Sequence, residues 1–184
     1  MIKHRLAFLD TETTGLDFDK NEIIEIGCVL VDQDWSGELP VFTVVDEFEI
    51  KIKPERIEDA DPVSLRINKY DPSDWVFAYT QEEGMKILAN KTKGCIMVAH
   101  NLCFDASFID RAFKKTQVLN EMHYLRLDTI TMAFAKLHDN REVEKYSLRS
   151  LCEYFNIQNK NAHTALADAR ALYELFTKLI FLNK

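Results

Sequence analysis

Four acidic residues and one histidine, set among apolar or small residues in three separated stretches, have the types that metal-dependent chemistry requires. They are Asp10 and Glu12 in FLDTETTGLD, Asp105 in AHNLCFDASF, and His163 with Asp168 in HTALADA. A carboxylate cannot enter an apolar interior alone without a large desolvation cost. If the fold brings all four acids together they need cations, and oxygen ligands suit hard ions such as Mg²⁺ or Mn²⁺. The set therefore predicts a metal-dependent enzyme.

The electrostatic cost of gathering four acids supports this prediction. Two unit charges about 5 Å apart repel by about 3 kcal/mol at an effective dielectric constant of ~20. Because a domain has a total stability of only about 5–15 kcal/mol, four such acids without cations would strain it. Two divalent ions would remove the strain and would form the pair, ~3.5–4 Å apart, that two-metal hydrolases use on phosphodiesters.

The first motif places two acids at the end of a predicted strand. Residues two apart in an extended chain point to the same face, so Asp10 and Glu12 can both reach one metal. Thr13 and Gly15 follow, with small side chains and a flexible backbone that let a ligand approach closely. The alternative is a turn with two solvated acids, because D-x-E is common by chance.

The second motif places Asp105 in the first turns of a helix that follows a buried strand, with Asn101 as its N-cap. The helix dipole stabilises a carboxylate there by ~0.3–1 kcal/mol, which is also the structural explanation for the residue. His100 and Asn101 are either cap and loop residues or substrate contacts, and for His100 the structural role is slightly favoured.

The third motif is the most specific. Thr164 is a good N-cap for the last helix, so Asp168 falls one turn into the helix and His163 just before it. An imidazole with an unperturbed pKa near 6.5 is competent to take a proton from water at neutral pH. The alternative is a surface histidine, and the partnership with Asp168 argues against it.

Apolar runs and turn signals indicate a mixed α/β sheet with helices on its faces, and no repeat or linker interrupts it. The first three strands suggest an antiparallel meander, and helix and turn signals begin near Asp61-Pro62. The predicted strands are 5–9, 22–31, 41–53, 94–100 and 124–128; the predicted helices are 80–91, 147–154 and about 164–182, with two more that begin near Phe104 and Ile130.

Size and composition fit one globular domain. The chain has 184 residues, of which 47% are hydrophobic, and no apolar run is long enough to cross a bilayer. The first residues, MIKHRLAFLDTET, read as a strand and not as a signal peptide. No membrane association is expected.

Charge and cysteine usage restrict the partners and the compartment. A net charge of −7 argues against a protein that coats duplex DNA, although bound metal ions can supply positive charge where chemistry occurs. Cys28 and Cys95 lie in apolar runs and are expected to be buried free thiols. A reducing, cytoplasmic setting follows as the default.

The three motifs, D-x-E-T-T-G, H-N-x-x-F-D and H-x-A-L-x-D-A in this order, resemble the DnaQ-like branch of the DEDD exonuclease superfamily, from about Leu6 to Leu179. The His-type (DEDDh) subfamily is indicated because His163 stands five residues before Asp168; the Tyr-type carries tyrosine four before, where Thr164 stands. The resemblance implies one exonuclease domain over residues 1–184. It also implies a ribonuclease-H-like fold with a central mixed five-stranded sheet, three antiparallel strands followed by parallel ones, flanked by helices.

The resemblance also implies the role of each site residue, with two Mg²⁺ or Mn²⁺ ions as cofactors. Asp10 would bridge both metals, Glu12 and Asp168 would complete the first site, and Asp105 would hold the second metal. His163 would deprotonate the water that attacks the terminal phosphodiester and releases a 5′-nucleotide.

Substrate contacts follow from the same resemblance. The backbone around Thr13 and the side chain of Leu16 resemble elements that hold the terminal nucleotide, and His100 and Asn101 are the further candidates. Phe104 is similar to an aromatic that lines such sites, although core packing explains it equally well.

Two further positions carry weaker expectations. Asp128 matches a position near the family's active site, with a supportive role at most. Relatives often have glycine after the residue that matches Asn68, and Lys69 here leaves the substrate role of that loop open.

The leading hypothesis is a 3′–5′ exonuclease that acts on single-stranded DNA or RNA ends. The rivals are a proofreading, epsilon-like subunit of a DNA polymerase, an inactive nucleic-acid-binding module, and a hydrolase of nucleotides or short oligonucleotides. Because proofreading subunits often extend beyond the catalytic domain, the end at Lys184 favours a free-standing nuclease or a shortened form of a longer protein. All four acids are present, which argues against an inactive module. No residue plainly reads a 2′-hydroxyl, and the oligomeric state is open.

Overall fold

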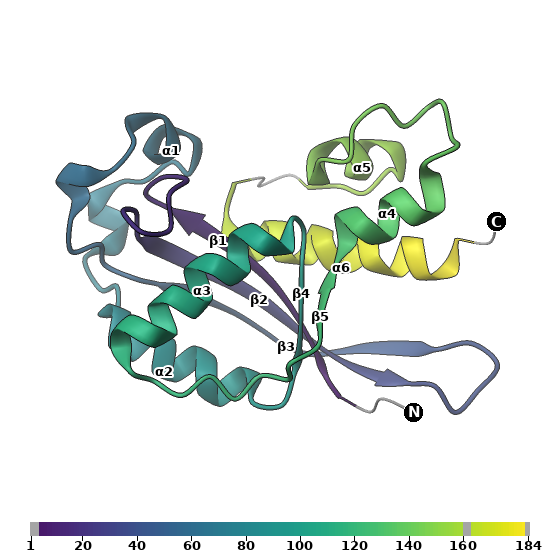
Figure 1. Cartoon of the computed structure of the whole chain (residues 1–184), viewed down its shortest axis with the longest axis horizontal. Helices are drawn as coiled ribbons and strands as arrows, with labels where there is room; N and C mark the ends of the chain where they lie inside the picture. The colour runs from purple at the N-terminus through teal and green to yellow at the C-terminus, as the bar shows by residue number, and fades with distance from the viewer. Residues whose placement is uncertain (1–3, 160–162, 183–184) are drawn as a thin grey trace.

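A five-stranded mixed sheet forms the centre of the protein (Figure 1), as a computed structural model shows for residues 4–159 and 163–182. The strand order is β3-β2-β1-β4-β5. The first three strands pair antiparallel, and β4 and β5 run parallel to β1. The predicted fold class and the antiparallel meander are confirmed. The strands are β1 (Leu6–Thr13), β2 (Ile23–Asp34), β3 (Val41–Lys51), β4 (Ile96–Ala99) and β5 (Arg126–Asp128).

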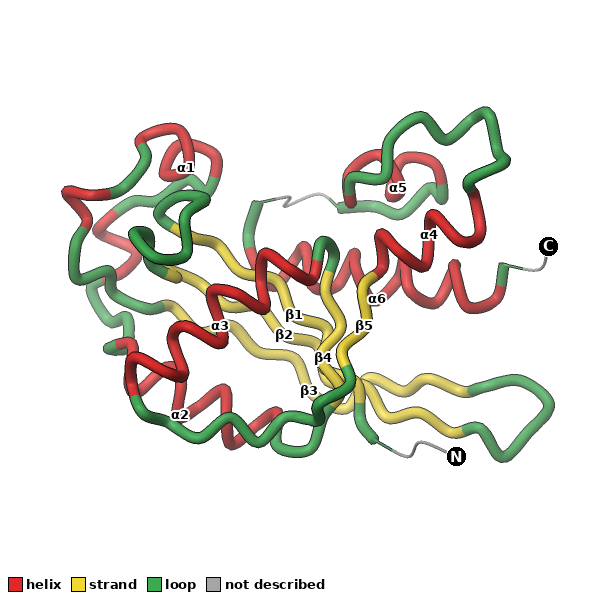
Figure 2. The backbone as a smooth tube through the Cα atoms, in the orientation of Figure 1, coloured by secondary structure: helices red, strands yellow, loops and turns green. Residues whose placement is uncertain are grey.

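In the part of the chain that the structure describes, six α-helices and two short 3₁₀ helices accompany the strands. Figure 2 shows helices on both sides of the sheet. The segment after Asp61 forms a short helix and a 3₁₀ turn, as its sequence predicts. Within the described residues no helix combines the length and apolarity that crossing a bilayer requires. The α-helices are α1 (Pro62–Ile67), α2 (Gln81–Thr92), α3 (Leu102–Thr116), α4 (Thr129–Leu137), α5 (Leu148–Tyr154) and α6 (Ala165–Phe181); the 3₁₀ helices are Ile57–Asp59 and Pro72–Trp75.

The side chains of β1 point alternately to the two faces of the sheet, and the hydrophobic core has one layer on each face. Ala7 and Leu9 face one side of the sheet, in a cluster with buried residues of α2 and α3. Leu6 and Phe8 face the other side, in a cluster with buried residues of α6. Because side chains alternate along a strand, even-numbered residues of β1 point toward α6 and odd-numbered ones toward α3.

β1 continues farther than its apolar residues suggest. The strand was expected to end at residue 9, but Asp10 pairs with Gly27 and Glu12 with Glu25 across the β1–β2 ladder. Backbone pairing with a long neighbouring strand extends β1 through the acidic motif. Both acids therefore sit inside the strand and not in the loop beyond it.

Two cysteine thiols are part of the buried core. Cys28 and Cys95 are free and buried, as predicted. Burial raises the pKa of both thiols, so they are poor nucleophiles.

The packing of Phe8 gives a test of the α6 layer. Phe8 is fully buried, and its ring centroid lies 5.2 Å from that of Tyr173 and 5.1 Å from that of Phe176. Phe8→Ala should lower the free energy of unfolding by about 3–5 kcal/mol, because the cavity cannot close completely. Urea unfolding measures this change. The control Phe77→Ala removes a ring that is 97% exposed and should leave stability nearly unchanged; equal effects would contradict the assignment of Phe8 to the core.

Candidate active site

The four acids and the histidine come from three elements that meet at the end of β1. Asp10 and Glu12 lie on β1 and face α6, Asp105 lies in the first turn of α3, and Asp168 lies in the first turn of α6 with His163 just before it. The site thus combines residues of β1 with residues from one helix on each face of the sheet.

Asp105 is fixed against β1 by two hydrogen bonds. Its Oδ1 accepts from the backbone N of Thr11 at 3.0 Å and from the Thr11 hydroxyl at 2.8 Å. The side chain is 3% exposed. Burial raises the pKa of Asp105 to about 7, and the bonds from Thr11 only partly oppose this rise. The acid on α3 therefore reaches β1 directly.

Asp168 is held by the loop that precedes α6. Its Oδ2 accepts from the backbone N of His163 at 3.0 Å, and its Oδ1 accepts from Nδ2 of Asn159. A ring nitrogen of His163 and carboxylate oxygens of Glu12 and Asp168 all lie within 4.8 Å of one another. His163 has a φ of 68°, a left-handed conformation that costs a non-glycine residue free energy and that tertiary contacts must hold.

The charges of neighbouring acids act on Asp10 and Glu12. Burial raises the pKa of Asp10 well above its usual range, and the charges of Asp105, Asp168 and Glu12 raise it further. Burial, and then Asp168 and Glu25, raise the pKa of Glu12 to about 8. Mutual repulsion of this kind requires short separations.

The donor set fits divalent metal ions. Among the described residues, no lysine or arginine forms an ion pair with Asp10, Glu12, Asp105 or Asp168, and no hydrogen bond reaches the carboxylates of Asp10 and Glu12. Clustered carboxylates with free oxygen atoms are the ligands that Mg²⁺ and Mn²⁺ prefer. These four acids would hold the ions, and His163 lies beside them.

Two residues near the site were not anticipated from the sequence. Glu25 is buried on β2 opposite Glu12, and its Oε1 accepts from the backbone N of Ala165 at 2.7 Å. An acid inside the apolar run EIIEIGCVLV is the signal that could have identified it. Asn159, which contacts Asp168, stands in a polar stretch that carries no such signal.

The loop after β1 surrounds the predicted nucleotide contacts. The Thr13 carbonyl accepts from Nδ2 of Asn68 at 2.8 Å, and its hydroxyl donates to the Gly15 carbonyl at 2.7 Å. Leu16 is 77% exposed at the loop surface. Lys69 has a φ of 53°, the left-handed conformation that explains why glycine suits this position. Substrate contact by Thr13 and Leu16 stays a prediction.

His100 makes two contacts within the protein. Its Nδ1 lies 2.9 Å from the Thr129 hydroxyl, and its Nε2 lies 2.9 Å from the Tyr146 carbonyl. Burial lowers the pKa of His100. Since both ring nitrogens are engaged, the structural role accounts for the residue, and a substrate contact through the ring stays a prediction.

The expected capping by Asn101 is wrong. Asn101 occupies the N-cap position of α3, but its φ of 60° and ψ of 56° are left-handed and its side chain makes no capping hydrogen bond. Asp128 supplies that bond, because its Oδ2 accepts from the backbone N of Leu102 at 2.7 Å. Its Oδ1 accepts from the backbone N of Thr131 at 2.7 Å and so caps α4. Asn101 is exposed, and substrate contact by its side chain stays a prediction.

Thr164 shows a similar difference. It is the N-cap residue of α6, as predicted, but its side chain makes no capping hydrogen bond.

Phe104 is partly buried, with its ring centroid 5.0 Å from that of Phe108. Core packing therefore explains its position, and substrate contact by Phe104 stays a prediction.

Comparison with known proteins identifies related sequences. The RNase_T family model, described as Exonuclease, matches residues 7–176. The PolC-type DNA polymerase III of Caldanaerobacter subterraneus subsp. tengcongensis is 33% identical over 182 residues, which are 97% of this chain and 12% of that protein. The DNA polymerase III subunit epsilon of Treponema pallidum is 32% identical over 181 residues, 97% of this chain and 79% of that protein. The chain thus spans a small part of its PolC-type relatives.

Comparison with solved structures supports the fold. The structure of E. coli exonuclease I in complex with a dT13 oligonucleotide matches with a TM-score of 0.76 and 16% identity, over 96% of this chain and 41% of that chain. This likeness confirms the ribonuclease-H-like fold.

Without divalent ions, the free energy of unfolding should fall as the pH rises from about 5 to 8. The pKa values of Glu12 and Asp105 are about 8 and about 7 in the folded chain, against about 4 when unfolded, so the folded state binds more protons in this range. The decline begins above the unfolded-state values and ends once the pH has passed these folded-state values, where both states have lost the protons. Urea unfolding in EDTA measures the decline. Saturating Mn²⁺ should remove it, and an equal decline with Mn²⁺ would contradict the metal assignment.

Asp10→Asn should raise the melting temperature of the metal-free protein at about pH 8, by roughly 2–10 °C, because it removes the most crowded charge. Differential scanning calorimetry measures the change, and Mn²⁺ should no longer stabilise this variant. The exposed control Glu144→Gln should behave like the unmodified protein in both respects. A fall in the metal-free melting temperature of Asp10→Asn would contradict the repulsion described here.

Proposed function

Because the chain belongs to the RNase_T family of exonucleases, we propose that it is a single DEDDh domain that removes 5′-mononucleotides from the 3′ ends of single-stranded nucleic acid. The observation that carries the proposal is the meeting of four acids, of which Glu12 and Asp105 are buried, and one histidine at the end of β1. Neither a binding module nor a structural domain needs this costly juxtaposition.

The proposed cofactors are two Mg²⁺ or Mn²⁺ ions held by Asp10, Glu12, Asp105 and Asp168. Such ions supply Lewis-acid stabilisation to a phosphodiester and favour ionisation of water. The chain positions these ligands by hydrogen bonds from its backbone: Thr11 orients Asp105, and the N–H of His163 orients Asp168.

His163 is the proposed general base. Its ring is exposed and lies beside Glu12 and Asp168, so it is accessible both to water and to a substrate on the acids. The imidazole takes one proton from water, and the water oxygen bonds to the terminal phosphorus. The bond from phosphorus to the 3′-oxygen of the preceding nucleotide breaks, and that oxygen takes up a proton from solvent. The product is a 5′-nucleotide and a strand with a new 3′-hydroxyl.

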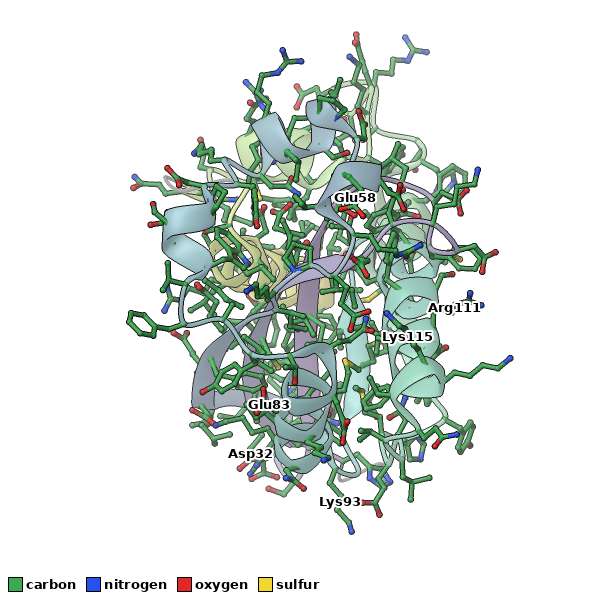
Figure 3. All side chains as sticks on the ribbon, turned by 90° about the vertical axis from the view of Figure 1, so that its left-hand side faces the viewer. Asp32, Glu58, Glu83, Lys93, Arg111 and Lys115 are labelled. Carbon is green, nitrogen blue, oxygen red and sulfur yellow. The ribbon has the colours of Figure 1, made fainter. Side chains whose placement is uncertain are left out.

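A cavity along α3 supports a polymeric substrate. Its volume is about 600 Å³, and Phe18 of the β1–β2 loop and Phe108 of α3 contribute to its wall. Arg111 and Lys115 project from α3 into the same region (Figure 3), where Arg111 pairs with Asp19 and Lys115 with Glu55. Aromatic and basic side chains together suit a single strand, and because the basic groups are already paired the salt dependence of binding should be modest.

A second candidate, proofreading for a DNA polymerase, rests on the relatives. The PolC-type and epsilon proteins are named as DNA polymerase III and its subunit. That role uses the same active site and requires a DNA substrate and a polymerase partner. A preference for RNA would argue against it.

The proposal predicts shortening of 5′-labelled single-stranded oligonucleotides one nucleotide at a time from the 3′ end, in Mg²⁺ or Mn²⁺ and not in EDTA. Gel electrophoresis of matched DNA and RNA strands follows the reaction and measures the substrate preference. A strand blocked by a 3′-phosphorothioate linkage is the control. Internal cuts, or hydrolysis of mononucleotide esters alone, would overturn the proposal.

His163→Ala should lower kcat by about 10²–10⁴-fold and leave oligonucleotide affinity nearly unchanged, because a general base acts in the chemical step. Single-turnover kinetics and fluorescence anisotropy separate these two effects. The control His138→Ala changes an exposed histidine at the end of α4 and should keep full activity. A loss confined to affinity would show that His163 is not the base.

A further inference from the structure

The N-terminus of α6 rests directly on the backbone of β2. A Cβ atom at Gly27 would lie 2.1 Å from the carbonyl carbon of Ala165 and 2.2 Å from the nitrogen of Leu166. No side chain fits in that space, so glycine permits a backbone-to-backbone contact. The first turn of the helix is therefore seated on one defined point of the strand.

Glu25 holds the helix at this seat. It is 4% exposed, and its Oε1 accepts from the backbone N of Ala165 at 2.7 Å, while Ala165 itself is fully buried. The first N–H groups of a helix have no partner within the helix, and the positive end of the dipole favours an anionic acceptor there. The acceptor for the N–H of Ala165, the first residue of α6, comes from a strand 140 residues away in the sequence.

The anchored turn carries two residues of the site. Asp168 donates its backbone N–H to the Thr164 carbonyl at 3.0 Å, which ties it to the start of α6. The N–H of His163 bonds to the Asp168 carboxylate. Glu12 lies on β1 directly opposite Glu25. The bond between Glu25 and Ala165 therefore lies at the turn that carries Asp168 and follows His163, opposite Glu12.

The negative charge of Glu25 is unfavourable next to the other acids. Its charge adds to the repulsion that Asp10 and Glu12 already experience. A neutral acceptor of the same length would keep the bond to Ala165 without adding charge. The length of the side chain and its charge can therefore be separated by substitution.

We propose that Glu25 is a positioning residue, which through the Ala165 N–H sets the placement of Asp168 and His163 against Glu12. This role rests on the exonuclease function proposed above. Glu25 touches no substrate, and its effect passes through the first turn of α6.

Two substitutions test the role of length against that of charge. Glu25→Gln keeps the reach and the acceptor oxygen, so it should retain Mn²⁺ affinity and kcat close to those of the unmodified protein. Glu25→Asp keeps the charge but is one methylene shorter and cannot reach Ala165. It should weaken Mn²⁺ binding and lower kcat by about 10–100-fold, with little change in KM for a single-stranded oligonucleotide.

Glu83 provides a matched control. Its Oε2 accepts from the backbone N of Thr80 at 2.9 Å at the start of α2, a helix that carries no site residue (Figure 3). Glu83→Asp shortens an equivalent carboxylate and should leave Mn²⁺ affinity and kcat unchanged. A loss of both in this control would reduce the Glu25 effect to general destabilisation and would overturn the proposal.

Amide hydrogen exchange at Ala165, followed by NMR without metal or substrate, measures the anchor directly. The amide should be protected in the unmodified protein and in Glu25→Gln, and should exchange faster in Glu25→Asp. If the protein cleaves no oligonucleotide, the exonuclease proposal fails, but exchange and Mn²⁺ binding still decide the anchor. If Glu25→Asp does not fold, Glu25→Gln tests the proposal alone, because loss of amide protection at Ala165 in that variant would overturn it. An equal loss of Mn²⁺ affinity and kcat in both variants would also overturn it.

Discussion

The mutual repulsion of buried carboxylates is the constraint on which the rest of this structure depends. Asp10, Glu12 and Asp105 all have raised pKa values, and burial is the largest cause for each of them. Such a cluster lowers the stability of the metal-free chain, so the surrounding fold must hold it in place. Divalent ions of the kind proposed for this site would relieve the repulsion and would therefore favour the folded state. Stability and chemistry are therefore linked at a single point in the fold.

Among the described residues, the hydrogen bonds that hold Asp105, Asp168 and Glu25 come from backbone N–H groups, a hydroxyl and a side-chain amide, and not from basic side chains. Thr11 donates to Asp105, His163 donates its N–H to Asp168, and Ala165 donates to Glu25. A lysine or arginine would neutralise the acids and compete with a metal ion for their oxygens. A backbone donor orients a carboxylate and still leaves it most of its negative charge. Precise placement is thus achieved without loss of the capacity to bind cations.

The sheet brings together elements that approach from opposite sides. α3 packs on one face of β1 and α6 on the other, and their first turns converge beyond the apolar part of the strand. The close contact of α6 with β2, which Gly27 makes possible, brings that helix near enough for Asp168 to reach Glu12. The two apolar layers thus supply the rigidity that the charged end of the sheet lacks.

The sequence by itself determined the elements and the identity of the acids and the histidine. Alternating and helical apolar patterns depend on neighbouring residues, so the strands and helices were predicted to within a few residues, except that β1 extends through Glu12 by pairing with β2. Only the tertiary structure decided how the site is supported. The engagement of both nitrogens of His100, the left-handed backbone of Asn101, and the bond from Ala165 to Glu25 arise from contacts between distant segments. Local sequence patterns carry no information about such contacts, because the partner of each group is chosen by the packing of whole helices on the sheet.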